Sequence, residues 1–146
     1  MARRIGLVGC VKDKAKYPRP AKDLYESRLF RGRRAFVERS CTEWWILSAE
    51  HGLVHPSQVL APYDVTLKNA GTARRRAWSA RVLEELDRRV NLGPNDLAEI
   101  HAGVEYRDFG LITGLRSRGA QVAVPAAGLS LGQQLRFYKQ AGSHPS

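Results

Sequence analysis

The sequence predicts a three-layer α/β/α domain with a mainly parallel sheet of four or five strands. Four short apolar segments alternate with longer segments whose apolar residues recur every three or four positions. The first two short segments are almost continuously apolar, which is typical of strands buried on both faces of a sheet. At 146 residues the chain has the size of one domain. We therefore expect a single α/β domain over residues 1–146, with about residues 141–146 as a frayed tail.

The elements follow in chain order. The predicted strands are Ile5–Cys10, Trp44–Ala49, Leu97–Ala102 and Gln121–Pro125. Glu99 and His101 interrupt the third strand, so its pattern is weaker. The predicted helices are Ser27–Ser40, Thr72–Val90 with Thr72 as N-cap, Tyr106–Gly119 and Ser130–Gly142. Apolar spacing in the first helix includes a charged residue, because Arg33 falls in register with Phe30 and Val37. Strand and helix alternate, which favours parallel strands with helices on both faces.

The composition points to an anionic partner. Lys and Arg number 24 against 14 acidic residues, so the formal net charge is +10. This favours DNA, RNA, a nucleotide or an anionic membrane surface, although arginines on solvated faces would give the same balance. No apolar run approaches the roughly 18 to 20 residues of a membrane span, and the amino terminus lacks a secretion signal. Cys10 and Cys41 form no disulfide framework, so we expect a cytoplasmic protein with reduced thiols and no membrane partner.

The segment ILSAEHGLVHPSQVLAPYDVTL, residues 46–67, begins in a predicted strand and continues past its end. Ligands of parallel α/β folds bind beyond the carboxyl ends of the strands. Breaking an N-glycosidic bond develops positive charge on the sugar, which Asp64 could stabilise while Tyr63 stacks on the leaving base. Glu50 and His51 are candidates for proton transfer to the base. The alternative is structural: Tyr63 packs and Asp64 caps a turn.

Other segments that follow strands carry cations. Lys12 and Lys14 come after the first strand and are suited to phosphate, although the spaced glycines of a P-loop are missing. A solvated basic loop is the alternative. His101 and Arg107 follow or end the third strand and could meet a phosphate or a base edge. Arg107 could equally form a surface pair with Asp108.

Three further patterns in the sequence allow a functional interpretation. Tyr25 could stack on a base, and Ser27 could simply cap the following helix. Ser48 and His51 suggest a hydrolase, but the G-x-S-x-G turn is missing. The histidines lack the spacing of a metal site, so no metal is expected. No other cofactor is implied.

Five motifs carry a resemblance to a known family. They are, in order, LVGCVKDK, PAKDLYESRLF, WWILSAEHGLVHPSQVLAPYDVTL, IHAGVEYRDFG and VPAAGLSLGQQLRFY. Over nearly the whole chain they resemble a family of small, largely uncharacterised bacterial and phage proteins. The core LSAEHGLVHPSQVLAPYD also resembles the YaaA peroxide-stress family and archaeosine-synthase-type domains. These relatives imply a uracil-DNA-glycosylase-like fold and nucleic-acid or modified-base chemistry.

Residue by residue, the resemblance implies a site made of Cys10, Lys12, Lys14, Tyr25, Ser27, Ser48, Gly52, Tyr63, Asp64 and Arg107. His51 stands where many relatives have tyrosine, and the DNA-binding segments of the longer proteins are missing. Both departures leave the substrate open.

We therefore expect an N-glycosidase or base-exchange enzyme that acts on a nucleobase in DNA, RNA or a nucleotide. Its catalytic residues would be Asp64, Glu50 and His51. Base contacts would come from Cys10, Tyr25, Ser48 and Tyr63, and phosphate contacts from Lys12, Lys14, Ser27 and Arg107. The alternatives are a non-catalytic nucleic-acid-binding module and a nucleotide-binding regulatory domain.

Overall fold

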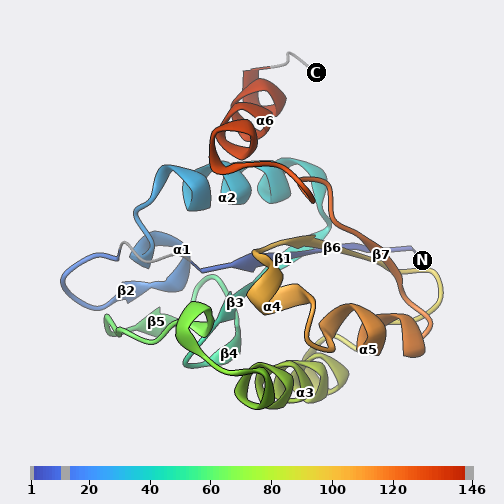
Figure 1. Ribbon diagram of the computed structural model, residues 1–146. Helices are drawn as coiled ribbons and strands as arrows, with labels where there is room; N and C mark the ends of the chain where they lie inside the picture. The colour runs from blue at the N-terminus through green and yellow to red at the C-terminus, as the bar shows by residue number, and fades with distance from the viewer. Residues whose placement is uncertain (1, 11–13, 144–146) are drawn as a thin grey trace.

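The computed structural model describes residues 2–10 and 14–143, with side chains up to residue 140, and it confirms the expected fold class. A five-stranded sheet runs through the molecule in the order β4-β3-β1-β6-β7 (Figure 1). Its strands are β1 (Arg4–Gly9), β3 (Glu43–Ser48), β4 (Gly52–Val54), β6 (Leu97–His101) and β7 (Gln121–Ala123). Only β4 is antiparallel to its neighbour; the other pairings are parallel.

The four predicted strands are present, each ending one or two residues earlier than expected. Apolar runs located them because β1 is buried at every position after Arg4, and the last four residues of β3 are buried as well. The sequence did not reveal β4, which is three residues long and follows a tight turn. That turn depends on Gly52, whose φ of +73° is a conformation that glycine adopts without strain.

Helices cover both faces of the sheet (Figure 1). On one side lies α2 (Arg28–Ser40), with α6 (Leu131–Ser143) packed against its outer surface. On the other side lie α3 (Thr72–Arg89), α4 (Val104–Arg107) and α5 (Leu111–Ser117), and the short 3₁₀ helix η1 (Leu67–Asn69) precedes α3. None of the helices in the described ranges is long and apolar enough to cross a membrane.

Three helix predictions were wrong in detail. The helix expected over Tyr106–Gly119 is two helices, α4 and α5, because Gly110 takes a φ of +123° that no right-handed helix accommodates. Thr72 is the first helical residue of α3, and Gly71 is the N-cap. The last helix, α6, spans Leu131–Ser143 and is shifted by one residue from the expected Ser130–Gly142. Residues 144–146 lie outside the described residues.

A second, two-stranded sheet joins the two long segments that follow β1 and β3. Strand β2 (Arg19–Pro20) pairs antiparallel with β5 (Val59–Leu60), and the four-residue helix α1 (Ala21–Leu24) follows β2. Backbone hydrogen bonds from Ala21 N to Gln58 O and from Lys22 N to Pro56 O extend the contact. The segments after β1 and β3 are therefore held side by side at one edge of the main sheet.

Candidate functional site

The carboxyl ends of β1 and β6 are the point at which the chain changes direction across the sheet. From β1 the chain passes over α2 to β3 on one side, and from β6 it passes over α4 and α5 to β7 on the other. Open α/β sheets bind ligands at such a switch point. The two strand ends approach closely, since a Cβ on Gly9 would lie 2.7 Å from the Cβ of Ala102. Two groups of polar side chains lie along this edge.

The first group is built around Tyr63. Its hydroxyl lies 2.5 Å from the hydroxyl of Tyr25 and 2.8 Å from Oγ of Ser48, the last residue of β3. The backbone N–H of His51 donates to the same Ser48 Oγ at 3.0 Å. Burial raises the pKa of both Tyr25 and Tyr63 above the usual range, so both phenols stay protonated. The structure thus joins Tyr25, Ser48 and Tyr63, three of the predicted base-binding residues.

The ring of Tyr63 has two further neighbours from the predicted set. Nζ of Lys14 lies 4.6 Å from its centre, over the face, which is the geometry of a cation–π contact. The His51 ring meets it edge to face at 5.2 Å. Tyr63 is half-buried, whereas Tyr25 is only 2% exposed and packs on Phe30. Tyr63 is therefore the aromatic residue of this group that a ligand can reach.

The two predicted catalytic carboxylates, Asp64 and Glu50, have different surroundings. Asp64 is exposed and forms no hydrogen bond or ion pair with any described residue. Glu50 is also exposed, and it lines a cavity of about 340 Å³ together with Trp78, Arg74 and Arg81 of α3. Of the two carboxylates, Asp64 is the one that directly follows Tyr63.

The remaining predicted residues have varied surroundings. Cys10 directly follows β1 and is buried, and its Sγ lies 3.3 Å from the hydroxyl of Tyr106. Ser27 caps α2, because its Oγ accepts a hydrogen bond from Phe30 N at 3.1 Å, as the alternative interpretation required. Lys12 lies outside the described residues. Arg107 lies beside the cavity described next, and its Nε donates to the carbonyl oxygen of Ala102 at 3.2 Å. Its Nη1 also lies 3.5 Å from Oδ1 of Asp108, which is the pair that the alternative interpretation expected.

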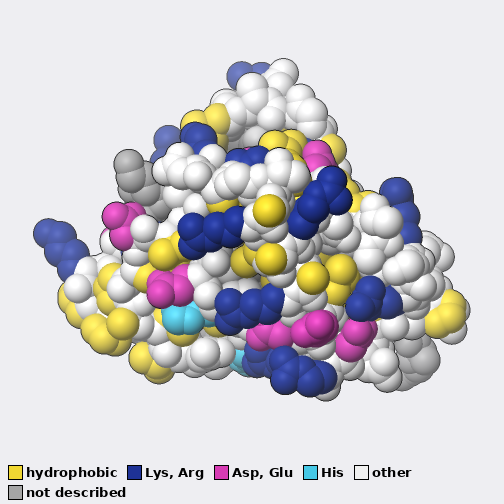
Figure 2. All heavy atoms as spheres, turned by 60° about the horizontal axis from the view of Figure 1, so that its bottom comes forward, with side chains coloured by type: hydrophobic (Ala, Val, Ile, Leu, Met, Phe, Trp, Pro, Cys, Tyr) yellow, Lys and Arg dark blue, Asp and Glu magenta, His cyan; other side chains and the backbone are white. Residues whose placement is uncertain are grey.

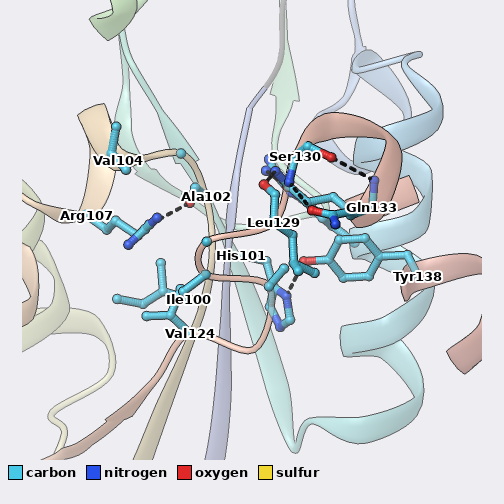
Figure 3. Close-up of a pocket in the computed structure, with 16 residues that line it drawn as sticks. Ile100, His101, Ala102, Val104, Arg107, Val124, Leu129, Ser130, Gln133 and Tyr138 are labelled. Atoms are coloured by element: carbon cyan, nitrogen blue, oxygen red, sulfur yellow. Dashed lines mark hydrogen bonds between the residues drawn. The ribbon is translucent and has the colours of Figure 1, made fainter. Parts of the chain in front are cut away.

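The second group surrounds a cavity of about 460 Å³ at the ends of β6 and β7 (Figure 3). This volume falls within the range of small-molecule sites. The lining comes from α2, β6, α4, α6 and the segment after β7, namely Arg33, Ile100, His101, Ala102, Gly103, Val104, Arg107, Val124, Ala126, Ala127, Gly128, Leu129, Ser130, Gln133, Gln134 and Tyr138. Among these described residues two are arginines and none is acidic.

A buried hydrogen-bonded chain leads into this cavity from the interior of the sheet. Oε1 of Glu99 lies 2.6 Å from Nε2 of His101. Nδ1 of His101 lies 2.7 Å from the hydroxyl of Tyr138 (Figure 3). Burial lowers the pKa of His101 despite the opposing effect of Glu99. A neutral imidazole that donates from Nε2 to the carboxylate accepts the Tyr138 proton at Nδ1. Burial raises the pKa of Tyr138 to about 12, so this hydroxyl stays protonated.

Sequence reasoning missed most of the second group. It had singled out His101 and Arg107, but not Glu99, Arg33 or Tyr138 as site residues. Two signals were present in the sequence: Glu99 and His101 interrupt an otherwise apolar strand, and Arg33 falls on the apolar face of its helix. Charged or titratable residues at buried positions need partners, so they often mark a site.

No metal cluster or disulfide is found in the part of the chain that the structure describes. No three His, Cys, Asp or Glu side chains among the described residues are placed to hold a metal ion. Cys10 and Cys41 are free thiols.

Comparison with protein-family models identifies a family for the chain. The family model described as "Family of unknown function (DUF6884)" matches residues 5–140, which is nearly the whole chain and includes all of both sheets except Arg4, the first residue of β1. No curated protein matches the chain.

Proposed function

The chain belongs to this family of unknown function, and we propose from its side chains that it is an N-glycosidase or a closely related base-exchange enzyme. Its substrate would be a nucleobase, normal or modified, in DNA, RNA or a nucleotide. The observation that carries the proposal is the pair Tyr63–Asp64. Tyr63 is fixed by two hydroxyl partners, and the next residue presents a carboxylate that no described residue engages.

A fixed aromatic ring beside an unpaired carboxylate suits this reaction. A nucleobase stacks on the exposed part of the Tyr63 ring, and Asp64 then lies near the sugar. The bond between the anomeric carbon and the base nitrogen breaks with its electron pair going to the base. The oxygen of a water molecule bonds to the anomeric carbon, and Asp64 accepts the proton that this water loses. His51, whose ring contacts Tyr63, is the residue placed to protonate the leaving base.

In this scheme His51 is a stronger proton donor candidate than Glu50. The side chain of Glu50 lines the cavity beneath α3, whereas His51 meets the ring on which the base would stack. For a substrate in duplex DNA the base must leave the helix, because a stacked base could not reach Tyr63.

The charge of the protein supports a phosphorylated substrate. The net charge is +10, and lysine and arginine side chains lie on several sides of a hydrophobic strip in the middle of the face shown in Figure 2. Lys14 contacts Tyr63 and Arg107 lines the neighbouring cavity, so cations lie on both sides of the switch point. We also propose a cytoplasmic location, because Cys10 and Cys41 are both free thiols.

The sequence resemblances point the same way. The core LSAEHGLVHPSQVLAPYD resembles the YaaA peroxide-stress family and archaeosine-synthase-type domains, whose folds are akin to uracil-DNA glycosylases. In this chain the same core supplies Ser48, Tyr63 and Asp64, whereas His51 stands where many relatives have tyrosine. The resemblance therefore falls on the pair Tyr63–Asp64 that carries the proposal.

Mass spectrometry of released bases tests the proposal. The wild-type protein is incubated with normal and modified DNA, RNA and nucleotide pools, beside Asp64→Asn and a matched control, Asp87→Asn. Asp87 pairs with Arg118 on the surface of α3. We expect one base to be released by the wild type and by Asp87→Asn, and its release by Asp64→Asn to fall at least a hundredfold, because a general base contributes about 10²–10⁴.

Two outcomes would contradict the proposal that the protein is an N-glycosidase or base-exchange enzyme. Release that is equal for wild type and Asp64→Asn removes Asp64 from the chemistry. No release from any pool, together with DNA or nucleotide binding that weakens with salt, leaves a non-catalytic binding module or a nucleotide-binding regulatory domain.

A further inference from the structure

Arg33 is a buried cation without a carboxylate partner. Its residue is 5% exposed, yet no Asp or Glu of the described chain forms an ion pair with it. Its two hydrogen bonds reach neutral oxygens at long distances, 3.4 Å from Nη1 to Gly9 O and 3.3 Å from Nη2 to Gln134 Oε1. Its Nε, also buried, has no hydrogen-bond partner among the described residues.

Such an arrangement costs stability. A guanidinium has five N–H donors, and removing its charge from water is expensive unless an anion compensates. Burial lowers the pKa of Arg33, and the interaction with Tyr138 and, more weakly, that with Glu105 oppose this only in part. The carboxylate of Glu105 lies beside Gly103 and does not line the cavity. The cavity that Arg33 lines is therefore the place where an anion would compensate its charge.

We propose that the cavity between the ends of β6 and β7 is a phosphate site, in which Arg33 and Arg107 bind the phosphate monoester of a small nucleotide or sugar phosphate. Phosphate binding by this cavity stands on its own observations. The identification of the ligand as a nucleotide rests on the proposed function, because the Tyr63 group lies along the same edge of the sheet.

The cavity matches a phosphate monoester in charge and in donors. Arg33 and Arg107 both line it, and no acidic residue does so among its described lining residues. Arginine presents its donors in a planar fork that fits phosphate oxygens. Helix α6 begins here, with Ser130 and Gln133 at its first turn (Figure 3), and the amino end of a helix favours an anion. A cavity of about 460 Å³ admits a small molecule and excludes duplex nucleic acid.

Tyr138 has a positioning role in this site. Its hydroxyl is held by His101, which is in turn held by Glu99, and its interaction with Arg33 favours the charged guanidinium. The three-residue chain therefore fixes one wall of the cavity from inside the sheet. Gln134 supports Arg33 from α6 and donates from Nε2 to Leu129 O at 3.0 Å. The guanidinium is thus held in one place before a ligand arrives.

Calorimetric titration of the full chain tests the site. The probes are the four ribonucleoside monophosphates, ribose 5-phosphate, inorganic phosphate and the corresponding unphosphorylated nucleosides. The variants are Arg33→Gln, Arg107→Gln and the matched control Arg31→Gln, an exposed arginine two positions earlier on α2. We expect Arg33→Gln and Arg107→Gln each to weaken phosphate-ester binding by about tenfold or more, with Arg31→Gln unchanged.

The probes separate the two sources of the phosphate. Nucleoside monophosphates that bind more tightly than ribose 5-phosphate identify a nucleotide site, and equal affinities identify a sugar-phosphate site. Binding that Arg31→Gln weakens as much as Arg33→Gln reports only general surface charge and overturns the proposal, as does binding of none of the phosphate esters. Base release is not measured in this experiment, so phosphate binding stands or falls independently of the glycosidase.

Thermal unfolding without ligand provides the second measurement. Arg33→Met removes the uncompensated charge and keeps an unbranched side chain, so we expect an unfolding midpoint equal to or above that of the wild type, together with loss of phosphate-ester binding. A lower midpoint with binding retained would make Arg33 a structural residue and overturn its assignment to the site. Should Arg33→Gln fail to fold, Arg107→Gln decides the binding question.

Discussion

The carboxylate of Glu99 and the imidazole of His101 lie side by side in the interior of the sheet, with Oε1 and Nε2 2.6 Å apart. Both residues are 1% exposed. The second oxygen of Glu99 accepts from Nε of Arg4 at 2.6 Å, so the carboxylate has a cation on one side and a histidine on the other. The pKa of Glu99 is lowered from 4.5 because these two partners outweigh the effect of its burial. Glu99 is therefore ionised in the folded protein.

Replacing Glu99 by Gln tests this pair. The amide cannot neutralise Arg4, and it offers His101 a weaker acceptor. We expect the free energy of unfolding at pH 7 to fall by about 2 kcal/mol, less than for a fully buried pair because Arg4 is partly solvated. Urea denaturation measures the change. Glu84→Gln, on the exposed face of α3, is the matched control, and a similar loss there would remove the effect from the buried pair.

The stability of the protein should fall as the pH decreases below about 6.5. Burial gives His101 a pKa below its ordinary 6.5, and the charges of Arg4 and Arg33 lower it further while Glu99 opposes them. The unfolded chain then binds a proton more readily than the folded chain. Stability due to neutral His101 is thus fully present above pH 6.5 and is lost as the pH falls through the folded-state value.

Denaturation curves of wild type and His101→Gln between pH 7.5 and 5 measure this effect. These pH limits are chosen as roughly one unit above and one and a half below the ordinary histidine pKa. We expect the difference in unfolding free energy between the two proteins to shrink as the pH falls. A difference in unfolding free energy that stays constant with pH would show that His101 has the same pKa in the folded and unfolded chains.

The Tyr25–Tyr63 hydroxyl pair should behave as one unit. Tyr63→Phe removes the hydroxyl that bonds both Tyr25 and Ser48, and we expect it to destabilise the fold by about 1–3 kcal/mol, because the buried Tyr25 hydroxyl loses its partner. When Tyr25→Phe is added to Tyr63→Phe, it should lower the free energy of unfolding by less than it does in the wild-type protein. A double-mutant cycle from urea denaturation gives the coupling, and strict additivity would contradict it.

Gly9 should tolerate no larger side chain at the switch point. Gly9→Ala would place its Cβ 2.7 Å from the Cβ of Ala102 and 3.0 Å from its Cα. We expect a loss of about 1–3 kcal/mol of unfolding free energy from overpacking. Ala102→Gly in the same chain should recover part of it. Thermal unfolding of the two single variants and the double variant provides the measurement, and no recovery would place the strain elsewhere.

The sheet could be predicted because its strands are buried on both faces and therefore read as apolar runs. Helix α2 followed from its three-and-four spacing, and the carboxyl edge followed from the alternation of strands and helices. The division into α4 and α5 could not be predicted, because a glycine inside an apolar pattern does not reveal its φ. The three-residue strand β4 depends on pairing with β3, which the local sequence does not encode.

How much of the candidate site could be predicted depends on how far apart its residues lie in the sequence. The segment from Ser48 to Asp64 is continuous in the sequence, so its polar residues stood out together. The cavity instead combines Arg33 with Gln134 and Tyr138 from α6, and Arg33 and Gln134 are 101 positions apart. Whether an arginine or a glutamate becomes buried is decided by the packing of α2 on α6 and of β6 in the sheet. The sequence shows such residues only as exceptions to an apolar pattern.

The position of α6 links ligand binding to completion of the fold. This helix follows every strand of the sheet and packs on the outer surface of α2 (Figure 1). Gln134 and Tyr138 on it form one wall of the cavity. A chain whose last helix has not docked has the whole sheet but only part of the binding site. Any ligand of the cavity will consequently bind the fully assembled chain alone, and it will slow amide hydrogen exchange in α6 as well as at its own contacts.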